Sequence, residues 1–130
     1  MKRVGGRVTW LLEFDRRFEA SVRDGLKRQT LRRCHIVEAG DTLRFSRGGD
    51  AGVFAEATCT RSRTITIGVC EWDGRMTCWA ALGGVGMSRG ELDALAVADG
   101  FEGGAHELVE WLEARGKFFA GLYDGQLIEW

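Results

Sequence analysis

The sequence predicts an α+β domain in which one early helix and two late helices accompany a small mixed β-barrel. About six short segments show the apolar alternation or the turn boundaries of strands. The chain has 19 glycines and no proline, and two late segments repeat apolar residues at helical spacing. Because single hydrophobic cores usually span roughly 100–150 residues, we expect residues 1–130 to form one domain.

The first predicted elements are a strand and a short helix. Apolar residues alternate along residues 8–14, which is the period of a half-buried strand. Asp15 is a typical N-cap residue, and Phe18 and Val22 lie four residues apart on one helical face, so a helix is expected to follow. Gly25 is expected to end that helix.

The middle of the chain is predicted to be rich in strands. A Gly-Asp turn at residues 40–41 precedes the first of them. Strands are expected at residues 42–46, 53–60 and 64–67, and a hairpin at residues 69–79 that turns at Asp73-Gly74.

The late part of the chain is predicted to contain two helices and a last strand. Ser88 and Glu91 have the spacing of a capping box, which would open a helix that Gly100 ends. A second helix is expected at residues 105–115, with leucines facing inward and carboxylates facing solvent. A short strand is expected at residues 126–130.

Charge is unevenly distributed although the formal net charge is only −1. Residues 1–63 contain 14 Lys or Arg and 8 Asp or Glu, which is net +6, whereas residues 64–130 contain 4 and 11, which is net −7. If the fold keeps these halves on different faces, one face can attract phosphate groups.

The composition indicates a folded protein of the cytoplasm. Hydrophobic residues make up 45% of the chain and charged residues 28%, close to the average for globular domains. No uncharged run approaches the roughly 20 apolar residues of a membrane span, and residues 1–7 lack the apolar stretch of a secretory signal. We therefore expect a cytoplasmic location and no membrane partner. The sequence does not indicate an oligomeric state.

Four cysteines and two histidines do not match the ligand spacings of zinc sites. We therefore expect reduced, structural cysteines, no metal and no cofactor. Cys59 falls on the apolar side of its predicted strand. Cys70 and Cys78 flank the predicted turn at residues 73–74, so a disulfide between them is an open alternative.

The segment Gly25–Arg33 carries the chemistry that the sequence predicts. Residues 16–33 hold seven basic and two acidic residues. In an extended chain Arg28, Thr30 and Arg32 share one face, where two guanidinium groups beside a hydroxyl can bind a phosphate or a carbonyl oxygen. The alternative is a solvated basic edge strand that discourages aggregation.

Gly25, Lys27, Thr30 and Arg32 form the pattern G-x-K-x-x-T-x-R, which resembles the signature of the ASCH domain family. Further matches are Arg17-Phe18, Gly40-Asp41-Thr42-Leu43, Asp99-Gly100-Phe101 and Gly125-Gln126-Leu127-Ile128-Glu129-Trp130. The resemblance covers about residues 14–130. It implies a PUA-like β-barrel fold, a cleft lined by the G-x-K-x-x-T-x-R segment, and contacts with RNA or modified nucleosides.

One subgroup of that family looks like an amidohydrolase that acts on acetylated cytidine with a lysine, a threonine and a glutamate. Lys27 and Thr30 match the first two residues. Ahead of the helix expected from Met87-Ser88, where the glutamate would lie, this chain has Gly83-Gly84-Val85-Gly86. The candidates for a replacement carboxylate are Glu56, Glu71 and Asp73.

The leading interpretation is binding of RNA or of a modified nucleotide or nucleoside in a basic cleft. The predicted ligand-binding residues are Lys27, Arg28, Thr30 and Arg32, with Arg16, Arg17 and Arg33 attracting phosphates and Trp72 as an exposed stacking platform. The glycines at residues 83–86 are expected to form a rim of the cleft.

Two alternatives remain open. The first is a nucleic-acid-related hydrolase, either an acetylcytidine-type amidohydrolase or a ribonuclease, in which Lys27 and Thr30 are the catalytic residues. The second is a protein-interaction module that docks a basic partner through the acidic late helices, whose carboxylates are Glu102, Glu107, Glu110 and Glu113.

Overall fold

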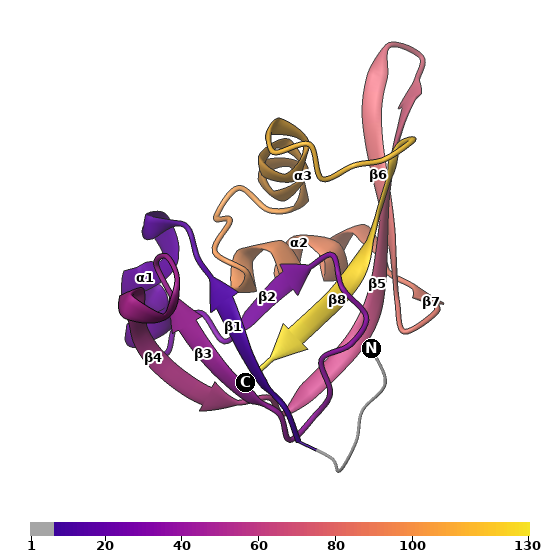
Figure 1. The fold of residues 1–130 in the computed structure, drawn as a ribbon. Coiled ribbons are helices and arrows are strands. Elements are labelled where there is room, and N and C mark those ends of the chain that lie inside the picture. The colour runs from indigo at the N-terminus through magenta and orange to yellow at the C-terminus, as the bar shows by residue number, and fades with distance from the viewer. Residues whose placement is uncertain (1–6) are drawn as a thin grey trace.

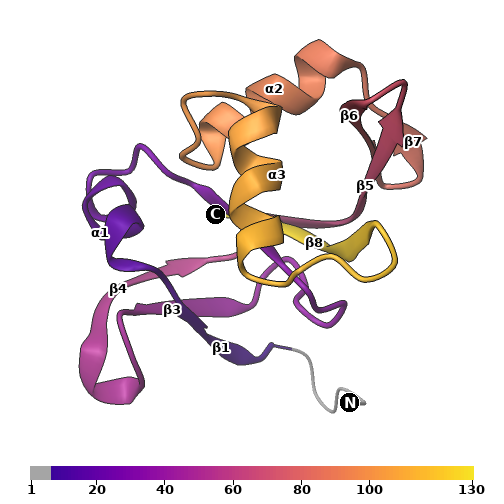
Figure 2. The same cartoon turned by 90° about the horizontal axis from the view of Figure 1, so that it is seen from above.

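Two β-sheets and three α-helices make up residues 7–130, which the computed structural model describes (Figures 1 and 2). One sheet has the order β1-β3-β4, with β1 at Thr9–Glu13, β3 at Thr42–Ser46 and β4 at Val53–Thr58. The other has the order β2-β8-β5-β6-β7, with β2 at Gln29–Arg32, β8 at Leu122–Glu129, β5 at Arg61–Trp72, β6 at Arg75–Leu82 and β7 at Val85–Gly86. The helices are α1 at Arg16–Arg23, α2 at Arg89–Ala98 and α3 at Ala105–Ala114, and a 3₁₀ turn spans Asp50–Gly52.

The α+β class with one early and two late helices is confirmed, but the predicted closure into a barrel is wrong. β1 pairs in parallel with β3, and β2 pairs antiparallel with β8, so both strands are edges of their sheets. Side chains occupy the seam between the two edges. The guanidinium carbon of Arg32 lies 4.8 Å from the centre of the Phe14 ring there, and no ladder of backbone hydrogen bonds joins the described edges.

The first strand and helix follow the sequence prediction. Asp15 caps α1 by accepting a hydrogen bond from the backbone N–H of Arg17 at 3.0 Å. Phe18 and Val22 are buried on the inner face of the helix. Gly25 has a φ of 75°, a left-handed conformation that ends the helix and redirects the chain toward β2.

The middle strands differ from the prediction in their bounds. The strand expected at residues 64–67 and the first arm of the hairpin form one continuous strand, β5. The hairpin turns at Asp73 and Gly74 as predicted, and both have positive φ, as a type I′ turn requires. Cys78 pairs with Val69, the neighbour of Cys70, so the two thiols lie on opposite faces of the sheet and are both free.

The late helices lie together above one face of the five-stranded sheet (Figure 2). Ser88 and Glu91 form the predicted capping box at the start of α2, and α3 buries Leu108 and Leu112. The last strand is longer than predicted because β8 begins at Leu122. Among residues 7–130, none of the helices combines the length and apolar character needed to cross a lipid bilayer.

Gly125 allows β8 to approach the backbone of β2, so we predict that Gly125→Ala destabilises the protein. An added Cβ atom would overlap the carbonyl oxygen of Arg32. Overpacking of this kind typically costs about 1–3 kcal/mol of unfolding free energy, which urea unfolding measures. The control is Gly90→Ala in α2, where the nearest atom is Ser88 Oγ at 4.0 Å and a gain of about 0.4–1 kcal/mol is expected. Equal stability of Gly125→Ala and wild type would contradict the packing of β8 on β2.

Candidate functional site

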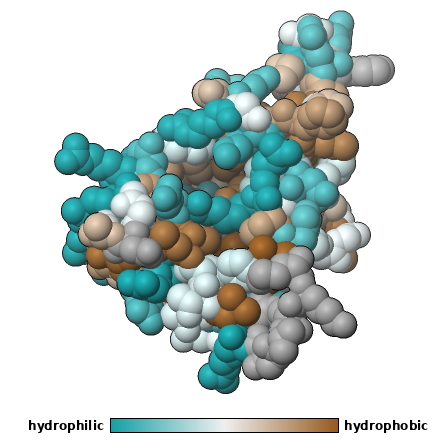
Figure 3. Space-filling model, viewed as in Figure 1, coloured by the Kyte–Doolittle hydropathy of each residue, from teal (hydrophilic) through white to brown (hydrophobic). Residues whose placement is uncertain are grey.

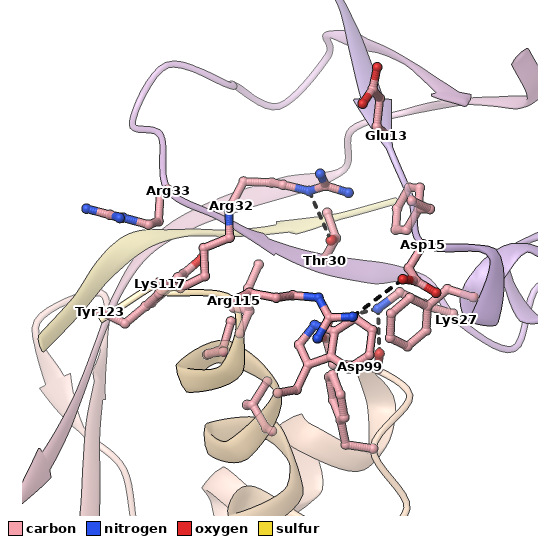
Figure 4. A pocket seen from close by; sticks show the side chains of 17 residues that line it. Glu13, Asp15, Lys27, Thr30, Arg32, Arg33, Asp99, Arg115, Lys117 and Tyr123 are labelled. Atoms are coloured by element: carbon pink, nitrogen blue, oxygen red, sulfur yellow. Dashed lines mark hydrogen bonds and ion pairs between the residues drawn. The ribbon is translucent and has the colours of Figure 1, made fainter. Parts of the chain in front are cut away.

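A cavity of about 200 Å³ opens in the seam between the two sheets (Figure 4). Its walls come from the end of β1, from Thr30–Arg33 at β2, from the connection between α2 and α3, from α3 and from β8. Figure 3 shows a hollow on this face whose depth is apolar and whose surroundings are hydrophilic. The open seam therefore provides a pocket where a closed barrel would have backbone.

The floor of the cavity contains a buried ion pair between Lys27 and Asp99. Lys27 Nζ donates to the backbone carbonyl of Asp99 at 2.5 Å and lies 3.1 Å from Asp99 Oδ1. Lys27 is 2% exposed and Asp99 is 5% exposed. Because Asp99 is the C-cap residue of α2, this contact ties the segment that leads into β2 to the end of a helix 72 residues further along.

Burial perturbs both members of this pair. Desolvation lowers the pKa of Lys27 and raises the pKa of Asp99, and in each case it outweighs the attraction of the opposite charge. Both shifts favour the neutral amine and the neutral acid. Asp99 Oδ1 accepts no hydrogen bond of good geometry from the described residues, so this oxygen retains capacity for another donor.

Thr30 presents a buried hydroxyl to the same cavity. Its side chain comes from β2, and the residue is 5% exposed. Arg32 Nε donates to Thr30 Oγ1 at 3.2 Å, while the Arg32 guanidinium lies over Phe14. Because the oxygen already accepts from Arg32, the hydroxyl proton remains available for donation to a ligand.

The structure brings together some of the sequence-predicted residues and separates others. Lys27, Thr30, Arg32 and Arg33 all line the cavity. Arg28 does not, because its Nε donates to the backbone carbonyl of Trp130 at 3.0 Å and its side chain borders a different hollow.

Arg16 and Arg17 of α1 do not line the cavity either. Arg17 donates to the carbonyl of Gly100 at 3.1 Å and to Glu107 Oε1 at 2.8 Å. Its guanidinium carbon also lies 4.9 Å from the centre of the Phe101 ring. These contacts give Arg17 a structural role, in which it joins α1 to the start of α3.

Three further groups of residues that the sequence placed at the site are not among the described residues that line the cavity. Trp72 ends β5 at the tip of a hairpin that projects from the body of the protein (Figure 1). Its side chain lies outside the described part, so the stacking platform stays a prediction. Residues 83–84 form the turn between β6 and β7, and residues 85–86 are β7 itself. None of these four residues lines the cavity, so the expectation that they form its rim is wrong. The carboxylates proposed as replacements, Glu56, Glu71 and Asp73, do not line it.

Sequence reasoning did not assign a site role to several residues that line the cavity, namely Asp99, Trp111, Arg115 and Lys117. One signal for Asp99 was present. A carboxylate at the C-terminal end of a helix faces the negative end of the helix dipole, which is an unfavourable position unless a cation accompanies it. The cation, Lys27, is too distant in sequence to be recognised from local patterns.

Comparisons of the chain with protein-family models, with curated proteins and with solved structures give no match. Within residues 7–130, no group of three or more His, Cys, Asp or Glu side chains is placed to hold a metal ion.

Removing one partner of the buried ion pair should be strongly destabilising. We predict that Lys27→Met lowers the unfolding free energy by about 3–5 kcal/mol, because Asp99 is left as an unpaired buried acid. Adding Asp99→Asn to that variant should recover most of the loss. Arg89→Met breaks the exposed Arg89–Asp93 pair and should cost less than about 1 kcal/mol. Urea unfolding compares the variants, and a Lys27→Met loss as small as the control would contradict the buried pairing.

Proposed function

We propose that this protein binds a modified nucleoside or nucleotide, free or as one unit of RNA, in the cavity at the sheet seam. The observation that carries the proposal is the combination of a small cavity with a floor made of the Lys27–Asp99 pair and the Thr30 hydroxyl. The volume of about 200 Å³ is below the roughly 300–1,000 Å³ of sites for drug-sized ligands. That size favours one base over a tract of nucleic acid.

The lining also has the chemistry that a base requires. A base has two flat apolar faces and an edge with alternating donors and acceptors. Phe14 and Trp111 are aromatic residues of the walls, and the guanidinium groups of Arg32 and Arg115 lie over their rings. Bases stack on guanidinium planes as well as on aromatic rings. At the floor, Thr30 and Lys27 are donors and Asp99 is an acceptor. Polar groups at fixed positions within apolar walls are typical of specific small-ligand sites.

The match to the G-x-K-x-x-T-x-R pattern supports the same proposal. Under it the fold is a PUA-like member of the ASCH family in which the barrel is open, RNA or a nucleotide is the partner, and the protein acts in the cytoplasm. The alternative of docking through the acidic helices has weaker support, because Glu107 is paired with Arg17 within the molecule.

Hydrolysis of an acylated nucleoside is a second candidate function, favoured by the position of Asp99. This carboxylate accompanies Lys27 and Thr30 in one cavity, and groups with shifted pKa values, as Lys27 and Asp99 have, are frequent at catalytic sites. Neutral Lys27 would take the proton of the Thr30 hydroxyl as Thr30 Oγ1 attacks the acyl carbon, and that proton would pass to the leaving amine as the C–N bond breaks. A water molecule would then hydrolyse the acyl-threonine ester, which releases the carboxylic acid and restores the hydroxyl. The hydrogen bond from Arg32 draws electron density from Thr30 Oγ1, which favours binding over attack by this oxygen.

Binding can be tested with a panel of unmodified, methylated and acetylated ribonucleosides and short RNAs by calorimetry. We expect binding of at least one modified member, and Thr30→Val should weaken it about three- to tenfold, the cost of one hydrogen bond. Thr77→Val changes an exposed threonine of β6 outside the cavity and should leave affinity unchanged. Binding that is insensitive to Thr30→Val would place the ligand elsewhere.

The hydrolase candidate predicts a characteristic pH dependence. Only the neutral amine of Lys27 accepts a proton, and its fraction grows as pH rises through the pKa. Because burial lowers the pKa of Lys27 from the ordinary value of 10.5, release of acetate from N4-acetylcytidine should rise with pH to a midpoint below 10.5. A rate of acetate release that does not change over this pH range would remove Lys27 as the base.

A further inference from the structure

The cavity has more cationic side chains than its carboxylates neutralise. Among the described lining residues, the cations are Lys27, Arg32, Arg33, Arg115 and Lys117, and the carboxylates are Glu13, Asp15 and Asp99. Asp99 is engaged by Lys27 at the floor. Glu13 accepts a hydrogen bond from the backbone of Gly49 at 3.2 Å. A positive surplus therefore remains at the opening.

We infer that this opening is a phosphate subsite, in which Arg115 and Lys117 bind the phosphate ester of a nucleotide whose base occupies the cavity. The inference rests on the proposed function and narrows it, because it makes a phosphate ester, and not a bare nucleoside, the preferred ligand.

Arg115 is held in a position from which it can change partners. Its guanidinium packs over the ring of Trp111, and its Nη2 lies 3.5 Å from Asp15 Oδ2, with the two side chains 39% and 44% exposed. This separation exceeds the roughly 2.7–2.9 Å of a strong charge-assisted hydrogen bond, and exposed ion pairs contribute little. A phosphate can therefore displace Asp15 and use the planar fork of the guanidinium for two hydrogen bonds.

Lys117 adds a second cation to the same opening. Figure 4 shows Arg32, Arg115 and Lys117 around one mouth, with Arg115 reaching across to Asp15. Gly116, with a φ of 65°, lies between Arg115 and Lys117 just after α3. Cations at this position also stabilise a helix C-terminus, but that role affects stability and does not make the protein prefer one ligand over another.

The cavity is thus divided by depth into two chemical zones. Lys27, Thr30 and Asp99 are almost fully buried, which suits the uncharged edge of a base. Arg115 and Lys117 are exposed at the mouth, where a phosphate keeps part of its hydration. A nucleoside would fill the first zone and leave the second without an anion.

The test is a calorimetric comparison of four sets of probes with the wild-type protein. The first set is five nucleosides, namely the four ribonucleosides and N4-acetylcytidine, and the second set is their 5′-monophosphates. The third set is RNA trinucleotides with each of these nucleosides in the middle, and the fourth is inorganic phosphate alone. For the nucleoside that binds, we expect a phosphate-bearing form to bind about tenfold more tightly. Arg115→Ala and Lys117→Ala should each reduce this ratio toward one. Arg89→Ala removes an arginine with a similar exposed aspartate partner, 3.3 Å away and outside the cavity, and should leave the ratio unchanged.

The outcomes separate the two proposals. Preference for the monophosphate identifies a free nucleotide as the source of the phosphate, and preference for the trinucleotide alone identifies RNA. Equal affinity for nucleoside, monophosphate and trinucleotide overturns the subsite and leaves the base pocket standing, as does a ratio that survives both substitutions. Arg115-dependent binding of inorganic phosphate without binding of any nucleoside supports the subsite and overturns the base pocket. Thermal unfolding without ligand reveals any helix-capping role of the two cations.

Discussion

The buried contact between Lys27 and Asp99 is the constraint on which the rest of the site depends. It holds the segment just before β2 against the C-terminal end of α2. Thr30 and Arg32 of β2 are thereby placed at the seam between the sheets. A buried ion pair is costly to desolvate, and well-packed apolar residues often stabilise a fold equally well. This pair lies in a cavity, where desolvation lowers the pKa of Lys27 and raises the pKa of Asp99, so it is a candidate for ligand binding or proton transfer as well as for stability.

The uneven charge of the sequence is partly offset by ion pairs between the two halves of the chain. Lys27 pairs with Asp99, Arg17 with Glu107 and Arg61 with Glu129. The basic half therefore does not form one uniform phosphate-binding face. The cationic surplus is instead local, at the mouth of the seam, and two of its members, Arg115 and Lys117, come from the acidic half.

Local features were predictable because neighbouring residues determine them. The Asp15 cap, the capping box at Ser88 and the turn at Asp73-Gly74 each follow from a few adjacent side chains. Three other features could not be predicted from local sequence, because each depends on which elements the fold brings together. They are the open seam between the sheets, the partner of Lys27 and the cations that follow α3. The alternation of side chains along residues 28–32 correctly predicted that Thr30 and Arg32 share a face. It was wrong for Arg28, whose guanidinium donates to the backbone carbonyl of Trp130 and does not line the cavity.

The most direct test of this account is an NMR titration of the Lys27 side chain, observed at its Cε and Nζ, with and without a bound modified nucleotide. The account requires a midpoint below 10.5 in the free protein and a change in that midpoint when the cavity is filled. A midpoint at the ordinary value of lysine, unaffected by the ligand, would contradict it.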